Sequence, residues 1–306
     1  MNVLRLDLPV HTVDQELLLP QGTTLSPSVL SALVGSEKNR TQKKFSFLRY
    51  GSVKRDIRHF LAQPPYNIIF AEKEKTSDIL NLMQNVYFAG PLLQSLGYFQ
   101  QNDFNTYSHI LMVFALSALL AKDIIVNRKQ RLQEISAGPI HDIGKLCVPL
   151  SILRKSTPLT RREHIILSHH SVAGYVLLCH YCCDARGLAA RVARDHHERR
   201  NASGYPRGIH LKDHMIEIIA VSDVYDALLS PRPYRQGSYD NRTALEEITG
   251  MAERREIGWS VVKALVAHNR RAKIHYSKTR VSSEKRGTPP AGNLHGVIAE
   301  EEASGR

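Results

Sequence analysis

The sequence has few of the features that mark membrane, secreted or disulfide-rich proteins. No apolar run in its 306 residues approaches the about 20 that a membrane span needs, and the longest, residues 110–121, has the length of a buried helix. The start of the chain, MNVLRLDLPVHTVDQ, places acidic and polar residues where a signal peptide carries an apolar stretch. The sequence therefore predicts a cytoplasmic protein that makes no use of a membrane.

Cysteine is scarce, and its placement does not favour a metal site. Three of the four cysteines lie in the stretch CHYCC at residues 179–183. A closed zinc site needs four ligands and only His180 lies nearby, so the favoured interpretation is small apolar residues on a helix in a reducing compartment.

The net charge of +12 lies mostly in residues 101–275. A basic surface attracts anions, but a solvated basic face also exists without a ligand.

Composition and pattern divide the chain into three parts. Residues 1–100 are expected to form a small α/β or mixed module, a regulatory or dimerisation element, with strand-like alternation in VLRLDLPV. Ser26 and Pro27 predict the start of a helix, and helical spacing over residues 76–96 predicts a connecting helix. These residues carry no catalytic motif. Residues 276–306 are polar and broken by Pro and Gly, which predicts a flexible tail.

Residues 101–275 have an almost purely helical pattern. Apolar positions recur at helical spacing, and Thr160 with Glu163 forms the pattern of a capping box. Pro139 cannot sit inside a regular helix, so a helix is expected to start or kink there. The fold class is therefore predicted to be mainly α, an all-helical bundle preceded by the small N-terminal module.

Histidine and aspartate recur on these apolar helices. A lone histidine on such a helix is usually an ordinary core residue. Five clusters in one bundle change the balance, because inward polar groups are costly unless they satisfy one another, and convergence on metal ions satisfies all of them. The clusters are His109; His141 and Asp142, with Lys145 three residues on; His169 and His170; His196, His197 and Glu198; and Asp223.

The ligand types indicate the chemistry. Imidazole and carboxylate without thiolate suit iron, manganese, nickel or zinc, and an adjacent His-Asp pair allows the carboxylate to bridge two ions. Two metals about 3.5–4 Å apart clamp the attacking and leaving oxygens of a phosphodiester displacement. The pattern therefore points to a hydrolase of phosphate esters.

Several stretches resemble one known family in order and spacing. HDIGK resembles the signature of the HD phosphohydrolase superfamily, and HHERRNASGYP is similar to the HHE…GYP stretch of its HD-GYP subfamily. VSDVYDALLSPRPYR and TYSHILMV are similar to that subfamily's later helix and loop and to its opening histidine helix. The resemblance covers residues 101–270 and implies an HD-type bundle, so residues 101–275 are assigned as an HD-GYP catalytic domain.

The resemblance implies a role for each matching position. Two divalent ions, iron or manganese, would be bound, with Asp142 as the bridge and a catalytic residue. Lys145 would contact phosphate or a metal-bound oxygen as a catalytic and substrate-binding residue, whereas Glu198 is expected to anchor the loop. The implied metal ligands are His109, His141, Asp142, His170, His196, His197 and Asp223. The implied substrate-binding residues are Lys145, Gly204, Tyr205, Pro206, Arg232 and Arg235.

Two departures from the family pattern bear on activity. Some members carry a glutamate that binds a third metal where this chain has Asn105, which favours two metals. The usual Asp-Gly before Ser-Gly-Tyr-Pro is Asn201-Ala202 here. Asn201 retains a local turn bond, but Ala202 lacks the freedom of glycine at positive φ, which affects the geometry of the loop.

The resemblance implies hydrolysis of cyclic di-GMP through a metal-activated hydroxide, to pGpG and on to GMP as a further step. Two alternatives remain open. One is an HD phosphohydrolase acting on another nucleotide. The other is a non-catalytic cyclic di-GMP sensor, or a docking module for diguanylate cyclases. Diguanylate cyclase domains and a second copy in a homodimer are the expected protein partners, and a nucleic acid polymer is not.

Overall fold

Short strands and helices alternate in the first hundred residues. The computed structural model describes residues 4–37, 43–231, 237–270, 274–291 and 299. Two antiparallel pairs, β1 with β2 and β3 with β4, are the sheets of the described chain. The elements are β1 (Val10–His11), β2 (Leu17–Leu19), α1 (Pro27–Glu37), β3 (Lys44–Ser46), η1 (Phe47–Arg49), α2 (Val53–Leu61), α3 (Tyr66–Ile69), α4 (Lys73–Gln84), β4 (Tyr87–Ala89) and α5 (Gly90–Asn102).

Helices and short 3-10 turns are the regular elements of the rest of the described chain, which confirms the mainly α class. The α-helices are α6 (Phe104–Ile124), α7 (Arg128–Ile135), α8 (Leu150–Leu153), α9 (Arg161–Ser168), α10 (His170–Cys182), α11 (Leu188–Asp195), α12 (His214–Leu229), α13 (Asn241–Glu253) and α14 (Trp259–His268). The 3-10 turns are η2 (Gly138–Ile140), η3 (Ile143–Cys147) and η4 (Tyr276–Lys278).

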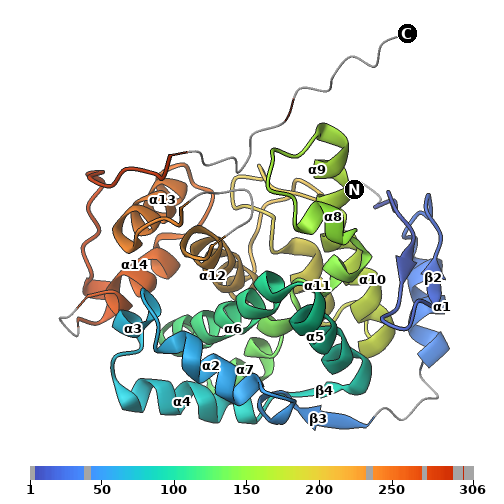
Figure 1. The fold of residues 1–306 in the computed structure, drawn as a ribbon, viewed down its shortest axis with the longest axis horizontal. Coiled ribbons are helices and arrows are strands. Elements are labelled where there is room, and N and C mark those ends of the chain that lie inside the picture. Colours follow the sequence, from blue (N-terminus) through green and yellow to red (C-terminus); the bar gives the residue numbers. More distant parts are fainter. Residues whose placement is uncertain (1–3, 38–42, 232–236, 271–273, 292–298, 300–306) are drawn as a thin grey trace.

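Helix α6 is the central element of the core. Every residue from His109 to Ala121 is buried, and the helix packs against α2, α5, α12 and α14 (Figure 1). By length and composition α6 is also the one helix among the described residues that could cross a membrane, but 83% of its apolar window is buried in the structure. A core helix passes the same test, so this finding is weak evidence for a span.

The first hundred residues cover the helical bundle in two places. Figure 1 shows β1, β2 and α1 beside α10, whereas α2 and α4 lie along α6. Their apolar side chains, among them Val10, Ile57 and Ile69, belong to the same hydrophobic core as the bundle. The division at residue 100 stays a prediction. Any test of it has to take into account that both parts of the chain share one hydrophobic core.

Local start and stop signals are largely confirmed. Ser26 Oγ accepts a hydrogen bond from Val29 N at 3.3 Å at the start of α1, and Thr160 and Glu163 form the capping box of α9. Pro139 lies in the first positions of η2, after α7 has ended at residue 135. The predicted starts therefore follow from side-chain hydrogen bonds and from proline geometry.

The predicted connecting helix over residues 76–96 is wrong. The chain forms α4, then strand β4, then α5, so the helix is interrupted at residues 85–89. The cause is long-range: β4 pairs with β3, and Phe88 packs edge-on against Phe47 with ring centroids 5.7 Å apart. A pairing partner some forty positions earlier leaves no trace in local periodicity.

The described residues beyond 275 lie against the bundle. Thr279 is buried, and Gly287 N donates to Glu246 Oε2 on α13 at 2.8 Å. The prediction of a flexible tail over residues 276–306 falls partly on residues outside the described set. It stays a prediction, and these contacts are the ones that a mobility measurement should examine first.

Candidate metal centre

All seven predicted ligands converge at one buried place in the bundle. Six are buried and His197 is half-buried. They form three groups whose nitrogen or oxygen atoms lie within 4.8 Å of one another: His170, His196 and His197; His109, His141 and Asp223; and His141, Asp142 and His196.

Five separate elements deliver these side chains. The α6 and α12 helices provide His109 and Asp223, and α10 begins at His170. His141 and Asp142 lie at the junction of η2 and η3, and His196 and His197 directly follow α11. Residues far apart in sequence are therefore brought together by the packing of α6, α10, α11 and α12.

A glycine sets how closely the HDIGK turn approaches α10. A Cβ at Gly144 would lie 1.9 Å from His170 O and 2.4 Å from Gly174 N, which no side chain can occupy. The backbone of the turn therefore touches the backbone of the helix. This contact holds Asp142 and His170 at a fixed separation.

Asp142 occupies the centre of the cluster. Its Oδ2 lies 3.5 Å from His109 Nε2 and 3.4 Å from His141 Nε2. Its Oδ1 lies 3.4 Å from His170 Nε2 and 3.9 Å from His196 Nε2. One carboxylate therefore faces two separate groups of ring nitrogens, the arrangement required of a bridging ligand.

Backbone carbonyls fix the ring tautomers of three histidines. His141 Nδ1 lies 2.7 Å from Gly138 O, and His170 Nδ1 lies 2.6 Å from Leu167 O. His196 Nδ1 lies 3.0 Å from the carbonyl oxygens at both 192 and 193. A carbonyl only accepts, so each Nδ1 carries the proton and each Nε2 presents a lone pair.

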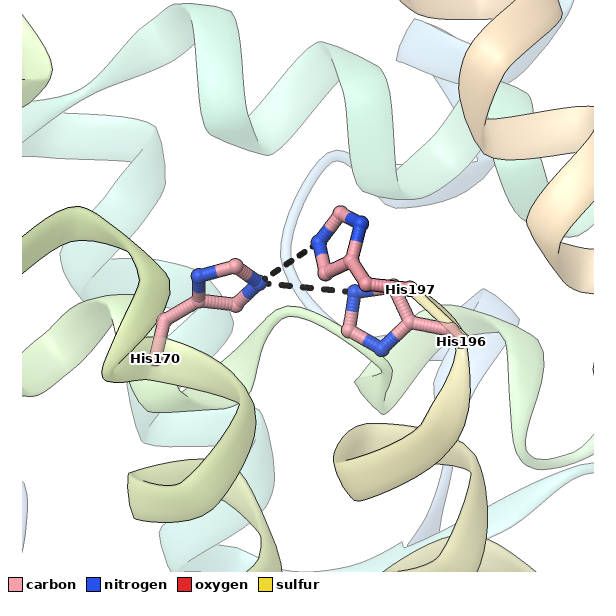
Figure 2. A group of neighbouring side chains, drawn as sticks. All are labelled: His170, His196 and His197. Carbon is pink, nitrogen blue, oxygen red and sulfur yellow. Dashed lines mark hydrogen bonds between the residues drawn. The ribbon is translucent and has the colours of Figure 1, made fainter. Parts of the chain in front are cut away.

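These lone pairs face one another. Figure 2 shows His170 Nε2 pointing at the ring nitrogens of His196, 3.4 Å away, and His197, 3.0 Å away. Because His170 and His196 both present acceptors, their contact is not a hydrogen bond. His141 Nε2 is buried without a hydrogen-bond partner among the described residues, and the Asp142 oxygen 3.4 Å away is itself an acceptor. A cation between these atoms satisfies all of them.

Protonation of the rings does not remove this conflict near neutral pH. Burial, reinforced by neighbouring rings, lowers the pKa of His196 to about 3 and holds the pKa of His197 well below its usual value. Burial also lowers the pKa of His170. The lowered pKa values favour the neutral form of these three rings, which is the form that binds a metal.

The two carboxyl groups are ionised despite their burial. Burial alone would raise the pKa of Asp142, but the charge of Lys145 and contacts with His141 hold it well below the usual range. Hydrogen bonding and charge from His109 likewise outweigh burial at Asp223. Lys145 Nζ donates to Asp142 Oδ2 at 2.6 Å. Two carboxylates and several imidazole lone pairs with one lysine form a site suited to divalent cations.

The predicted GYP loop packs directly on the paired histidines. A Cβ at Gly204 would lie 2.2 Å from His197 O and 2.5 Å from Glu198 Cα, so glycine is required. The Tyr205 ring stacks on His197, with centroids 4.5 Å apart and planes 18° apart. Pro206, the third residue of the loop, follows directly. The loop therefore places an aromatic face beside the metal site.

Glu198 anchors the loop, as expected. Its carboxylate is fully buried and accepts hydrogen bonds from Arg207 N at 2.7 Å and Ile209 N at 3.0 Å. Asn201 Oδ1 accepts from Ser203 N at 3.1 Å, the local turn bond expected of it. Ala202 has φ +62°, so a non-glycine residue occupies the left-handed region there, at a cost of about 1–2 kcal/mol.

A model of the HD domain family matches residues 93–261 of this chain. The chain belongs to the HD domain family. The resemblance inferred from HDIGK and its neighbouring motifs is thereby confirmed, and the seven predicted ligands lie within the matched range.

Curated relatives of this HD domain protein include several phosphodiesterases. A cyclic di-GMP phosphodiesterase of Thermotoga maritima is 36% identical over 138 residues, 44% of this chain and 38% of the relative. One from Pseudomonas aeruginosa is 37% identical over 165 residues, 53% and 38% of the two chains. A 3'3'-cGAMP-specific phosphodiesterase of Vibrio cholerae is 36% identical over 133 residues, 42% and 30%. The match with each spans less than two fifths of the relative's length.

Solved structures of related proteins are similar at low identity. An HDG"Y"P protein from Bdellovibrio bacteriovorus has a TM-score of 0.47 at 15% identity, covering 86% of this chain and 94% of that chain. The HD domain of a Listeria monocytogenes phosphodiesterase, in complex with cyclic-di-AMP, has a TM-score of 0.43 at 20% identity, covering 57% and 93%.

Sequence reasoning missed Asp226 in this HD domain. It is fully buried on α12, and its Oδ2 lies 2.6 Å from His109 Nδ1. This contact fixes the His109 ring so that Nε2 faces Asp223 Oδ1 at 3.0 Å. The signal was the spacing in VSDVYDALL, because residues three apart share one helix face.

Four remaining predictions concern the choice between His169 and His170, the two arginines, Asn105 and the cysteines. His170, not His169, points into the cluster, and both ring nitrogens of the buried His169 lack hydrogen-bond partners among the described residues. The predicted phosphate-binding residues Arg232 and Arg235 lie outside the described residues. Asn105, in the position discussed for a third metal, is exposed on α6. The free cysteines, including Cys179, belong to none of the ligand groups found among the described residues.

Proposed function

We propose that this chain is a metal-dependent phosphodiesterase that hydrolyses cyclic di-GMP to pGpG, with GMP as a further product. The observation that carries the proposal is the buried convergence of ring lone pairs and carboxylates, which a bound cation would satisfy together. Relatives named cyclic di-GMP phosphodiesterases support the substrate. Relatives named as specific for 3'3'-cGAMP make that cyclic dinucleotide the second candidate.

We further propose two divalent ions, iron or manganese. Two outer groups support this number: His109, His141 and Asp223 on one side, and His170, His196 and His197 on the other, with Asp142 between them. The donors are nitrogen and oxygen, without thiolate, which suits either metal. When bound, two such ions activate water and neutralise charge on a phosphodiester.

Different side chains are proposed to orient the metal ligands and to bind the substrate. Asp142 holds the two ligand groups together. Lys145 keeps Asp142 ionised and oriented through the 2.6 Å hydrogen bond, and its partly exposed ammonium group would meet a substrate phosphate. Tyr205 offers a ring face for a base, with Gly204 and Pro206 shaping the loop. Arg232 and Arg235 are proposed to grip phosphate oxygens, by the resemblance alone.

The wider assignments are proposals of the same kind. The protein would act in the cytoplasm, with diguanylate cyclase domains and a second copy of the chain as protein partners and without a nucleic acid polymer or a membrane. Residues 1–100 would be the regulatory or dimerisation module. The non-catalytic alternative, a cyclic di-GMP sensor or docking module, predicts binding without turnover.

Metal analysis combined with a substrate panel tests the proposal. The protein is purified without oxygen, its metal is measured by elemental analysis, and it is incubated with cyclic di-GMP, 3'3'-cGAMP and cyclic-di-AMP. Two metals per chain and fastest hydrolysis of cyclic di-GMP support the proposal. Fastest hydrolysis of 3'3'-cGAMP replaces the substrate. Binding of cyclic di-GMP without hydrolysis of any member of the panel favours the sensor.

A further inference from the structure

A tyrosine from the N-terminal hundred residues reaches the support of the metal site. Tyr66, on α3, is buried, and its hydroxyl donates to Asp226 Oδ1 on α12. The other oxygen of Asp226 lies 2.6 Å from His109 Nδ1 and accepts from Ser230 Oγ at 3.1 Å. A continuous hydrogen-bonded path therefore runs from α3 through α12 to a candidate metal ligand on α6.

Each link of this path restrains the next. A carboxylate that accepts the Nδ1 proton of a histidine fixes the tautomer and orientation of the ring, and raises its basicity toward a metal at Nε2. Asp226 does this for His109 only while its own two oxygens are held. Burial, together with the negative charge of Asp226, raises the pKa of Tyr66 well above its usual value, so the hydroxyl stays a donor.

A second contact joins the same two parts of the chain. Tyr107, on α6, donates to Asp56 Oδ2 on α2 at 2.8 Å, and Asp56 also accepts from Ser52 Oγ. This bond is of the same type as the Tyr66 bond, a tyrosine hydroxyl on a carboxylate between the N-terminal elements and the bundle. It does not touch Asp226, so it provides a matched control.

We propose that Tyr66 is a positioning residue of the metal centre, which sets metal affinity through Asp226 and His109. The inference rests on the metal site of the proposed function, and adds that the N-terminal hundred residues help to form it. A displacement of α3 would then weaken metal binding without contacting a ligand. This gives the N-terminal elements a physical route for regulating the site.

Manganese affinity of the full chain tests the proposal without relying on activity. Mn²⁺ is titrated into metal-free protein, and the electron paramagnetic resonance signal of free Mn²⁺ gives the dissociation constant. Substitution of a residue that hydrogen-bonds to a metal ligand costs about 10–100-fold in metal affinity. We expect about tenfold weaker binding for Tyr66→Phe and a larger loss for Asp226→Asn.

The double variant distinguishes positioning from a general loss of stability. Because Tyr66 acts through Asp226, adding Tyr66→Phe to Asp226→Asn should change affinity by less than about twofold. The control Tyr107→Phe loses an equivalent bond and should bind Mn²⁺ as the wild type does. Thermal unfolding of all four variants without metal reports any shared loss of stability.

Several outcomes would overturn the inference. They are wild-type affinity in Tyr66→Phe, an equal loss in Tyr66→Phe and Tyr107→Phe, or additive losses in the double variant. If Tyr66→Phe does not fold, Ser230→Ala removes a different donor to Asp226, and unchanged affinity there refutes the proposal. A wild-type protein that binds no Mn²⁺ overturns the metal site as well. Metal binding without hydrolysis overturns only the proposed function.

Discussion

The Asp142→Asn substitution is expected to destabilise the metal-loaded protein and to leave the metal-free protein nearly unchanged. In the metal-free state the carboxylate faces ring lone pairs, including His170 Nε2 at 3.4 Å. An asparagine amide can donate to such a nitrogen. The substitution also weakens the 2.6 Å hydrogen bond from Lys145, because a neutral carbonyl oxygen replaces the charged acceptor of a bond worth about 1.5–3 kcal/mol. The two effects oppose each other, so we expect a net change of about 1 kcal/mol or less.

In the metal-loaded protein the substitution has a larger effect on the free energy of unfolding. At a free metal concentration of about a thousand times the dissociation constant, binding stabilises the folded state by about 4.1 kcal/mol. If the loss of the central ligand lowers affinity by about a hundredfold, the upper range for supporting residues, the same concentration contributes about 1.4 kcal/mol. The expected difference is therefore about 2.7 kcal/mol, together with loss of hydrolysis.

Urea unfolding followed by circular dichroism measures both quantities. Wild type and variant are unfolded in excess Mn²⁺ and in chelator, and the four free energies of unfolding are compared. Asp240→Asn is the control, because Asp240 caps α13 through Arg242 N and Thr243 N and lies outside the ligand groups. Equal destabilisation of Asp142→Asn in the two buffers would refute the assignment of Asp142 as a metal ligand.

Four further predictions concern the metal count and the loop. Protein prepared without oxygen should contain two metals per chain by elemental analysis, and a clear value of three would contradict the significance given to Asn105. Tyr205→Ala should weaken use of cyclic di-GMP far more than Mn²⁺ affinity, because the ring, stacked on His197, offers its face to a substrate base and belongs to none of the ligand groups; equal losses would show that the loop is structural. Gly204→Ala should lower turnover about a hundredfold, the cost of a displacement of about 1 Å, whereas Gly35→Ala, with open space on α1, should keep full activity. Ala202→Gly should raise the free energy of unfolding by about 1 kcal/mol in urea titrations by relieving the left-handed backbone, and no gain would show that Ala202 is unstrained.

The convergence of the candidate ligands was predictable because each of them belongs to a motif that carries its own local structure. The HDIGK turn contributes His141 and Asp142, the helix that begins at His170 contributes a third side chain, and the order of the motifs specifies the bundle. Asp226 was not predicted, because its spacing of three residues from Asp223 places it on the same helix face but does not identify its partner. Its role depends on His109, which lies more than a hundred residues earlier.

The error over residues 76–96 has a similar origin. Helical periodicity is a local signal, and it continues from α4 into α5. The strand between them exists because β3 offers hydrogen bonds and Phe47 offers a ring face. Contacts of this kind, like the bond from Tyr66 to Asp226, are decided by tertiary packing and not by propensity.

The contact between Gly144 and α10 makes one dimension of the site a property of the backbone. With a peptide unit of one segment against a peptide unit of the other, no rotamer change or core substitution can widen or narrow the gap gradually. Substitutions among descendants of this sequence would then alter the GYP loop and the residues that hydrogen-bond to the candidate ligands. The separation of Asp142 from His170 would stay constant. For protein engineers, Gly144 is a position to keep unchanged while the surrounding side chains are exchanged.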